Sequence, residues 1–123
     1  MSDWLPRYAH EKPVPMLTSA PVTGGQLVYI SGNNTIAPTS SASTLAFGIA
    51  AMDDLVGGNV ITVFRACIGT IAASGAIAAA TAIIPAASGA VATIGADTIY
   101  DQVCGQALSA ASGGLVYVSF RPL

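Results

Sequence analysis

The chain has 123 residues, and only 8% of them are charged, whereas about 25% is typical of soluble domains. A chain of this length can form one domain with a hydrophobic core. Its net charge of −2 excludes a strongly basic protein that binds nucleic acid or an anionic membrane through charge. A free monomer with so few charges would be prone to association, so we expect a component of an oligomer or lattice. A small monomer solvated by Ser and Thr is the alternative.

Residues 1–21 differ in composition from the rest, and we expect them to form an extended N-terminal arm, with a β domain over residues 22–123. Proline removes backbone donors and fixes φ, so neither a regular helix nor a central strand is expected in this proline-rich segment. Its apolar residues are nevertheless too many for an inert disordered tail. Two outcomes stay open, because the arm can grip a neighbouring molecule or fold back on its own domain. The prolines are Pro6, Pro13, Pro15 and Pro21, and the apolar residues are Trp4, Leu5, Tyr8, Met16 and Leu17.

After residue 21, short β-type runs alternate with turn signals. Expected strands cover residues 26–31, 45–51, 59–65, 102–110 and 115–121. A turn is expected at 31–34, because Gly and Asn both tolerate positive φ. Strands of this length, separated by Gly-rich turns, predict an all-β fold, either a small barrel or a sandwich.

Residues 66–96 carry no charge and allow three interpretations. A membrane span is disfavoured, because the window 66–84 holds only five strongly apolar residues, which contribute roughly −1.5 to −3 kcal/mol to insertion. A helix over 76–84 has good propensity, but Ser-Gly pairs and Pro85 cut the run into pieces of strand length. Residues 91–94 alternate as a strand does. We therefore expect short strands and turns that pack against sister subunits, with at most one helical turn near 78–82.

The two cysteines, Cys67 and Cys104, fit no disulfide framework and have no second ligand at metal-binding spacing. We expect two isolated buried thiols. The first thirteen residues contain no basic stretch followed by an apolar core, so we expect no secretion signal and synthesis in a reducing cytoplasm. The sequon Asn33-Asn34-Thr35 is then expected to be a turn rather than a glycosylation site.

No group of titratable residues indicates a catalytic, metal or cofactor site. The single histidine, His10, lies in the arm, where a catalytic base would be poorly held. Adjacent Asp53 and Asp54 are expected to be solvated on a turn, and Asp97 and Asp101 to lie in a polar loop. No phosphate-binding loop, nucleophile elbow or basic-aromatic stripe is present. We therefore expect no enzyme, no cofactor, no metal and no nucleic-acid partner.

Three segments together resemble the capsid cement, or head decoration, proteins of tailed bacteriophages. They are PVTGGQLVYISGNNTIAPTS (21–40), LAFGIAAMDDLVGGNVITVFRACIGTIAASGAI (45–77) and VCGQALSAASGGLVYVSFRPL (103–123), and the opening WLPRY also looks like that family's N-terminal segment. The likeness rests on order and spacing rather than on one diagnostic motif. It departs at RACIG (65–69), where a Gly-Gly step is common, and at 78–89, which lacks the usual Gly-Asp turn.

The resemblance implies a compact β domain that forms a homotrimer on the outer face of a mature virion capsid. It implies threefold and quasi-threefold positions, the major capsid protein as partner, and a mechanical role in stabilising the shell, with synthesis in the cytoplasm of a host bacterium. The residues expected to contact the partner are in the arm, where aromatic residues and Arg concentrate: Trp4, Leu5, Arg7 and Tyr8.

The alternative function is a β-sandwich module that binds a surface ligand such as carbohydrate. Sugar sites need exposed aromatic side chains beside polar ones. Outside the arm we expect most aromatic residues to belong to the core, which disfavours this function. They are Tyr29, Phe47, Phe64, Tyr100, Tyr117 and Phe120.

Overall fold

The structure is a computed structural model that describes residues 4–9 and 12–122. His10 lies outside the described residues, as do Asp3 and Glu11. Within the described part of the chain the structure has eleven strands, two short 3₁₀ turns and no α-helix. The all-β prediction is confirmed.

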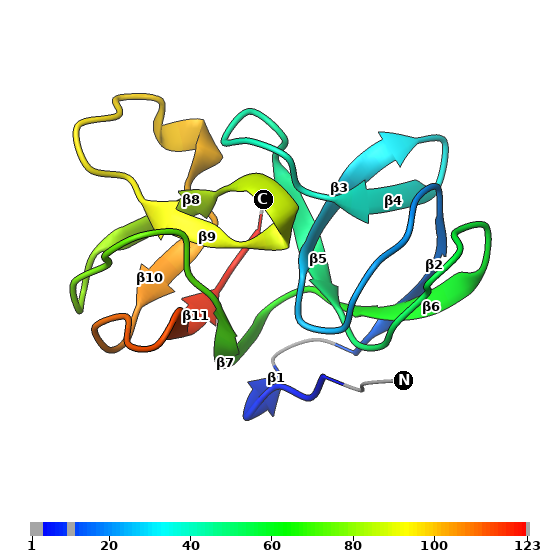
Figure 1. Ribbon diagram of the computed structural model, residues 1–123, viewed down its shortest axis with the longest axis horizontal. Coiled ribbons are helices and arrows are strands. Elements are labelled where there is room, and N and C mark those ends of the chain that lie inside the picture. The colour runs from blue at the N-terminus through cyan, green and yellow to red at the C-terminus, as the bar shows by residue number, and fades with distance from the viewer. Residues whose placement is uncertain (1–3, 10–11, 123) are drawn as a thin grey trace.

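Five strands close into a barrel, on the right in Figure 1. Around the barrel the order is β2 (Val14–Thr18), β4 (Thr35–Pro38), β3 (Leu27–Gly32), β5 (Ala46–Ala50) and β6 (Val60–Phe64). Alternation decides which side chains point inward, since a strand sends successive side chains to opposite faces. The buried barrel core consists of Val22, Val28, Ile36, Ala50, Ile61 and Val63.

The remaining six strands form a second sheet, on the left in Figure 1. This sheet curls on itself, because a parallel bridge joins Val91 on its last strand to Ala73, just after β7. The order is β1 (Tyr8–Ala9), β7 (Cys67–Ala72), β11 (Leu115–Phe120), β10 (Gly105–Ala107), β8 (Ala82–Pro85) and β9 (Val91–Thr93).

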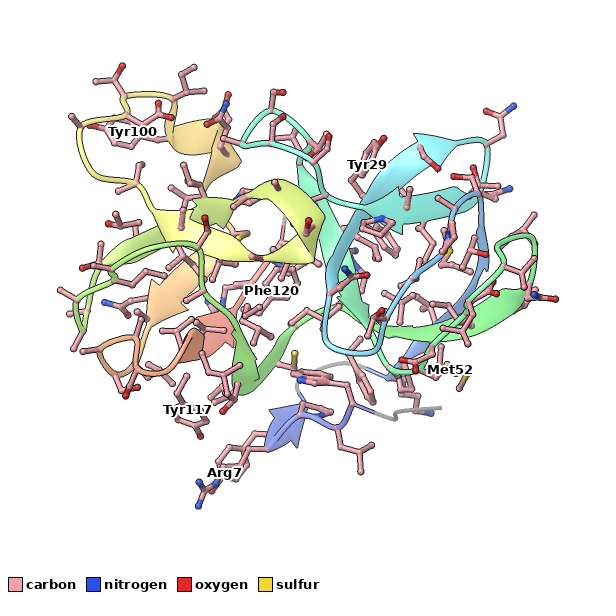
Figure 2. All side chains as sticks on the ribbon, in the orientation of Figure 1. Arg7, Tyr29, Met52, Tyr100, Tyr117 and Phe120 are labelled. Atoms are coloured by element: carbon pink, nitrogen blue, oxygen red, sulfur yellow. The ribbon has the colours of Figure 1, made fainter. Side chains whose placement is uncertain are left out.

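The curled sheet encloses the second core, and β11 shows how the sequence builds it. In β11, Val116, Val118 and Phe120 are buried, whereas the residues between them are half-buried or exposed. Phe120 lies in the middle of this half of the molecule (Figure 2). The core also contains Leu27 and Ile49 from the barrel strands β3 and β5, so the two halves share one apolar contact region.

The uncharged run over 66–96 forms β7, β8 and β9, and it supplies Cys67, Ile71, Ile83 and Val91 to the second core. The β prediction for this run is therefore confirmed. The helix over 76–84, which the sequence disfavoured, does not form, and neither does the single helical turn allowed near 78–82. Instead Thr81 donates to the Ala78 carbonyl in a reverse turn that leads directly into β8. Among the described residues, no helix is long and apolar enough to cross a membrane.

The 3₁₀ turns lie elsewhere, at Ala87–Gly89 between β8 and β9, and at Tyr100–Gln102. The second turn replaces the beginning of the strand predicted over 102–110, of which only Gly105–Ala107 is extended in the sheet. The turn predicted at 31–34 is confirmed at Asn33 and Asn34, where Asn34 has a φ of 57°.

Contrary to the expectation that proline excludes a central strand, the N-terminal segment supplies strand β2 to the barrel. Pro15 lies in β2 opposite Thr62 of β6. On the other side, β4 pairs only with Leu17 and Thr18, so at Pro15 that side of β2 has no neighbouring strand that needs a donor. An exposed proline is tolerated where one side of a strand is unpaired.

Candidate functional site

The expected contact residues belong to the leader, defined here as residues 4–9, and the structure places this leader on its own chain. The Trp4 backbone N–H donates to the Ala51 carbonyl at 2.7 Å, and the indole Nε1 donates to the Thr70 carbonyl at 2.8 Å. Trp4 also meets Phe64 edge to face, with ring centroids 6.0 Å apart. Ala51 and Phe64 lie in or beside barrel strands and Thr70 lies in β7, so Trp4 bridges the two halves of the molecule.

Two glycines make room for the Trp4 ring, and together with Phe64, Ala51 and Thr70 we call them the Trp4 socket. A Cβ at Gly69 would lie 2.7 Å from Trp4 Cζ2, and one at Gly25 would lie 2.9 Å from Cδ1. Gly69 falls between the buried residues Cys67 and Ile71 of β7, where alternation requires an inward side chain. The indole occupies this gap and covers the second core.

After Trp4 the leader runs along β7 as the edge strand β1. Arg7 donates its backbone N–H to the Ile68 carbonyl at 2.7 Å, and Tyr8 lies opposite Ile68 in an antiparallel ladder of two residue pairs. Leu5 is 77% exposed and Tyr8 59% exposed, and Arg7 is exposed as well. Figure 2 shows Arg7 and Tyr117 pointing away from the body close to β1.

The four predicted residues therefore divide into two groups. Trp4 is half-buried and packs against its own chain, whereas Leu5, Arg7 and Tyr8 remain available at the surface. An open hollow of about 380 Å³ lies between the groups, lined by Trp4, Leu5, Arg7, Gly69, Thr70 and Tyr117.

A second exposed apolar surface, which sequence reasoning missed, lies at one end of the barrel. Leu17 of β2 and Val60 of β6 are opposite each other and exposed, and the loop before β6 adds Leu55 and Val56, which are 75% and 81% exposed. The sequence did contain a signal for this surface. Leu55 and Val56 stand next to Gly57-Gly58, and apolar side chains in a glycine turn cannot reach the core. We call these four residues the barrel-end patch.

Asp54 holds this loop, and the expectation that it is solvated is wrong. Its carboxylate is only 6% exposed and accepts from Thr18 Oγ1 at 2.5 Å and from the Asn59 side chain at 3.0 Å. It also accepts from the backbone N–H groups of Val56, Gly57 and Asn59. These hydrogen bonds to one carboxylate fix the conformation of a loop that has no regular secondary structure and contains two consecutive glycines with positive φ.

These donors lower the pKa of Asp54 well below its ordinary value of 3.8, with the Thr18 hydroxyl contributing most and the Asn59 side chain next. Burial acts in the opposite direction and is outweighed. The neighbouring Asp53 accepts from the Gly24 N–H at 2.8 Å, so it too is bound to the backbone. Asp54 therefore acts structurally and is ionised at neutral pH.

The two thiols are free and buried, as predicted. Burial raises the pKa of Cys67 and of Cys104 to about 12, so neither is a thiolate nucleophile at neutral pH. Asp97 accepts from the Ile99 N–H in an irregular loop, as the sequence analysis expected. In the part of the chain that the structure describes, no three His, Cys, Asp or Glu side chains gather into a possible metal site.

The aromatic residues outside the leader are less buried than expected. Only Phe120 is fully buried, whereas Tyr100 is 70% exposed at the start of the second 3₁₀ turn. Phe47 is half-buried under the Arg65 guanidinium, whose Cζ lies 4.6 Å from the ring centre. Phe47 and Phe64 pack against the cores from half-buried positions, so three of the six rings contribute to a core, rather than most of them. The half-buried ones are Tyr29, Phe47, Phe64 and Tyr117.

No protein-family model matches the chain, and no curated protein matches it. Among solved structures, the N base of the head fiber gp8.5 of bacteriophage phi29 has the same fold, with a TM-score of 0.71 and 16% sequence identity. The likeness covers 91% of this chain and 97% of that one. The chain therefore has the fold of this head fiber base.

Proposed function

We propose that this chain is a structural virion protein that decorates the outer face of a mature phage capsid and stabilises the shell. In this proposal it is a homotrimer at threefold and quasi-threefold positions, where it binds the major capsid protein. It is made in the host bacterial cytoplasm, and its role is mechanical rather than catalytic.

One observation carries the proposal: the fold shared along 91% of the chain with the base of a phage head fiber. At 16% sequence identity, the likeness establishes the shared fold alone, and the virion role is our inference from that fold. The sequence resemblance to head decoration proteins, found in three segments spread along the chain, is independent support for the same class.

The surface agrees with a chain that works inside an assembly. Twelve large apolar or aromatic side chains are exposed among the described residues. Only 8% of the chain is charged, so these apolar groups have few charges around them. Single exposed apolar residues are ordinary, but a contiguous exposed group such as the barrel-end patch marks an interaction site. The twelve are Leu5, Tyr8, Leu17, Ile30, Leu45, Leu55, Val56, Val60, Ile99, Tyr100, Leu108 and Leu115.

Within the leader we propose different roles for the buried and exposed residues. Leu5, Arg7 and Tyr8 contact the capsid, since they are exposed, and since aromatic residues and Arg dominate binding energy at interfaces. Trp4 positions them by fixing the start of β1. Three leaders in one trimer would raise the effective concentration of the second and third contacts, so each contact can be weak.

Stabilisation of the shell follows from linkage. A ligand that binds only the expanded lattice lowers the free energy of that state, and the gain grows with ligand concentration. The test is co-sedimentation with purified expanded capsids and with unexpanded precursor shells. We expect binding to expanded capsids and an increase in the temperature at which they release DNA. Binding to a glycan array without binding to capsids would favour the carbohydrate module instead.

A further inference from the structure

The leader and the groove beneath it, defined as the edge of β7 together with the Trp4 socket, have the features of a ligand and its binding site. The leader adds an edge strand to β7 through backbone hydrogen bonds, and one aromatic side chain enters the socket. Peptides are recognised in this way when an extended segment joins a sheet edge and a pocket selects one side chain. The socket residues, from Gly25 to Thr70, all come from outside the leader.

Few contacts hold the leader in place. Within the described residues its strand has two residues, whereas strands in globular proteins usually have three to ten, so this pairing alone fixes the described leader weakly. The largest side chain of the segment is the main anchor, because Leu5, Arg7 and Tyr8 are exposed. A segment held by one ring and a few backbone bonds can leave and return, and its departure uncovers the second core at Gly69.

We infer that the groove accepts the leader of a second copy of this chain as well as its own. The occupant would be chemically identical, so every hydrogen bond and the Trp4 contact would form again between copies. Exchange of an identical element is a low-cost route to association. This inference does not depend on capsid binding, since the exchange is a property of the free protein.

The first experiment uses Trp4 as its own reporter, because it is the only tryptophan in the chain. A synthetic peptide of residues 2–12 is titrated with the full-length Trp4→Ala protein, which contains no tryptophan. We expect saturable binding, seen as a shift of the peptide emission to shorter wavelength and a rise in anisotropy. Absence of saturable binding would overturn the inference.

Two glycine variants of that protein show whether the peptide uses the socket. Gly69→Val puts a side chain where the indole ring lies and should weaken binding by at least about tenfold. Gly32→Val is the matched control, since a Cβ there meets only the side-chain hydroxyl of Thr35, at 2.8 Å and away from the socket, and it should leave binding unchanged. Equal binding by both variants would contradict the inference.

The second experiment keeps Trp4 and does not depend on the fold of the Trp4→Ala variant. Leu5→Cys protein is mixed with Tyr117→Cys protein and treated with a short bis-maleimide, because residues 5 and 117 line one hollow. The native thiols are buried. We expect a cross-linked heterodimer that forms with Tyr117→Cys but not with Tyr100→Cys, whose loop is distant from the leader in Figure 2. No heterodimer, or equal yields from both partners, would exclude exchange.

Discussion

At the residue scale, the main finding is that one tryptophan and two glycines make a single unit. The sequence drew attention to Trp4 because it stands in a proline-rich segment, but it could not show that Gly25 and Gly69 lie on either side of its ring. These residues are far apart in sequence, and nothing in their local context distinguishes them from turn glycines. Only the tertiary fold brings them together.

Trp4→Ala should lower the free energy of unfolding by about 2 to 3 kcal/mol, less than the roughly 3 to 5 kcal/mol typical of a fully buried ring, because Trp4 is half-buried. Trp4→Phe should lose less, since a smaller ring refills part of the socket. Urea denaturation followed by circular dichroism measures both. Tyr8→Ala is the control and should change stability by no more than about 0.5 kcal/mol, because its ring is exposed. An equal loss in both alanine variants would show that the socket adds no stability.

Asp54 should make stability depend on pH in the acid range. Its pKa is lowered on folding, so its contribution is complete above the ordinary value of 3.8 and is lost as the pH falls below that value. Asp54→Asn should therefore destabilise the protein at pH 7 and differ less from the wild type at pH 3. Asp101→Asn, which removes an exposed carboxylate, controls for net charge. If the difference between wild type and Asp54→Asn grew as the pH fell, this account of Asp54 would be wrong.

The two thiols should report global unfolding. Because Cys67 and Cys104 are buried and their pKa values are raised to about 12, iodoacetamide should leave both unmodified at pH 8 in the native protein. Both should be alkylated in denaturant, and mass spectrometry counts the products. Rapid modification of either thiol in the native protein would show that its sheet opens locally.

At the element scale, the strands that appear as short apolar runs between turn signals were predictable and the others were not. Residues 27–32, 46–50, 60–64 and 115–120 are such runs and were located within one or two residues, and burial alternates strictly in the last two of them. β2 was missed because Pro15 argues against a central strand, and the unpaired stretch that tolerates Pro15 is a property of the closed barrel. The bounds of β8 were not predicted, because the alanine-rich run before it has no hydrophobic period and pairing with β9 and β10 decides where the strand begins.

The exposed side chains of the leader should contribute more to capsid binding than to the stability of the fold. If the proposed function holds, the triple variant Leu5→Ser, Arg7→Ser, Tyr8→Ser should keep the wild-type melting temperature within a few degrees and bind expanded capsids at least about tenfold more weakly. The matched control changes the exposed pair Ile99 and Tyr100 to Ser and should bind as the wild type does. A leader variant with undiminished binding would remove these residues from the capsid interface.

At the scale of the whole molecule, the fold class followed from composition, turn spacing and strand length. The division into a closed barrel and a curled second sheet did not, because the pairing of β7 with both β1 and β11 joins residues more than forty positions apart. The scarcity of charge indicated a component of an assembly. The structure shows, for one copy of the chain, which apolar side chains are exposed. The barrel-end patch and the leader are its two best-defined exposed surfaces.

An image reconstruction of the mature virion can show whether this chain decorates a phage capsid, as we propose. We expect density of this fold on the outer surface at threefold and quasi-threefold positions, with three copies together and Leu5, Arg7 and Tyr8 against the major capsid protein. Virions whose outer surface lacks this density, although the protein was present during assembly, would contradict it.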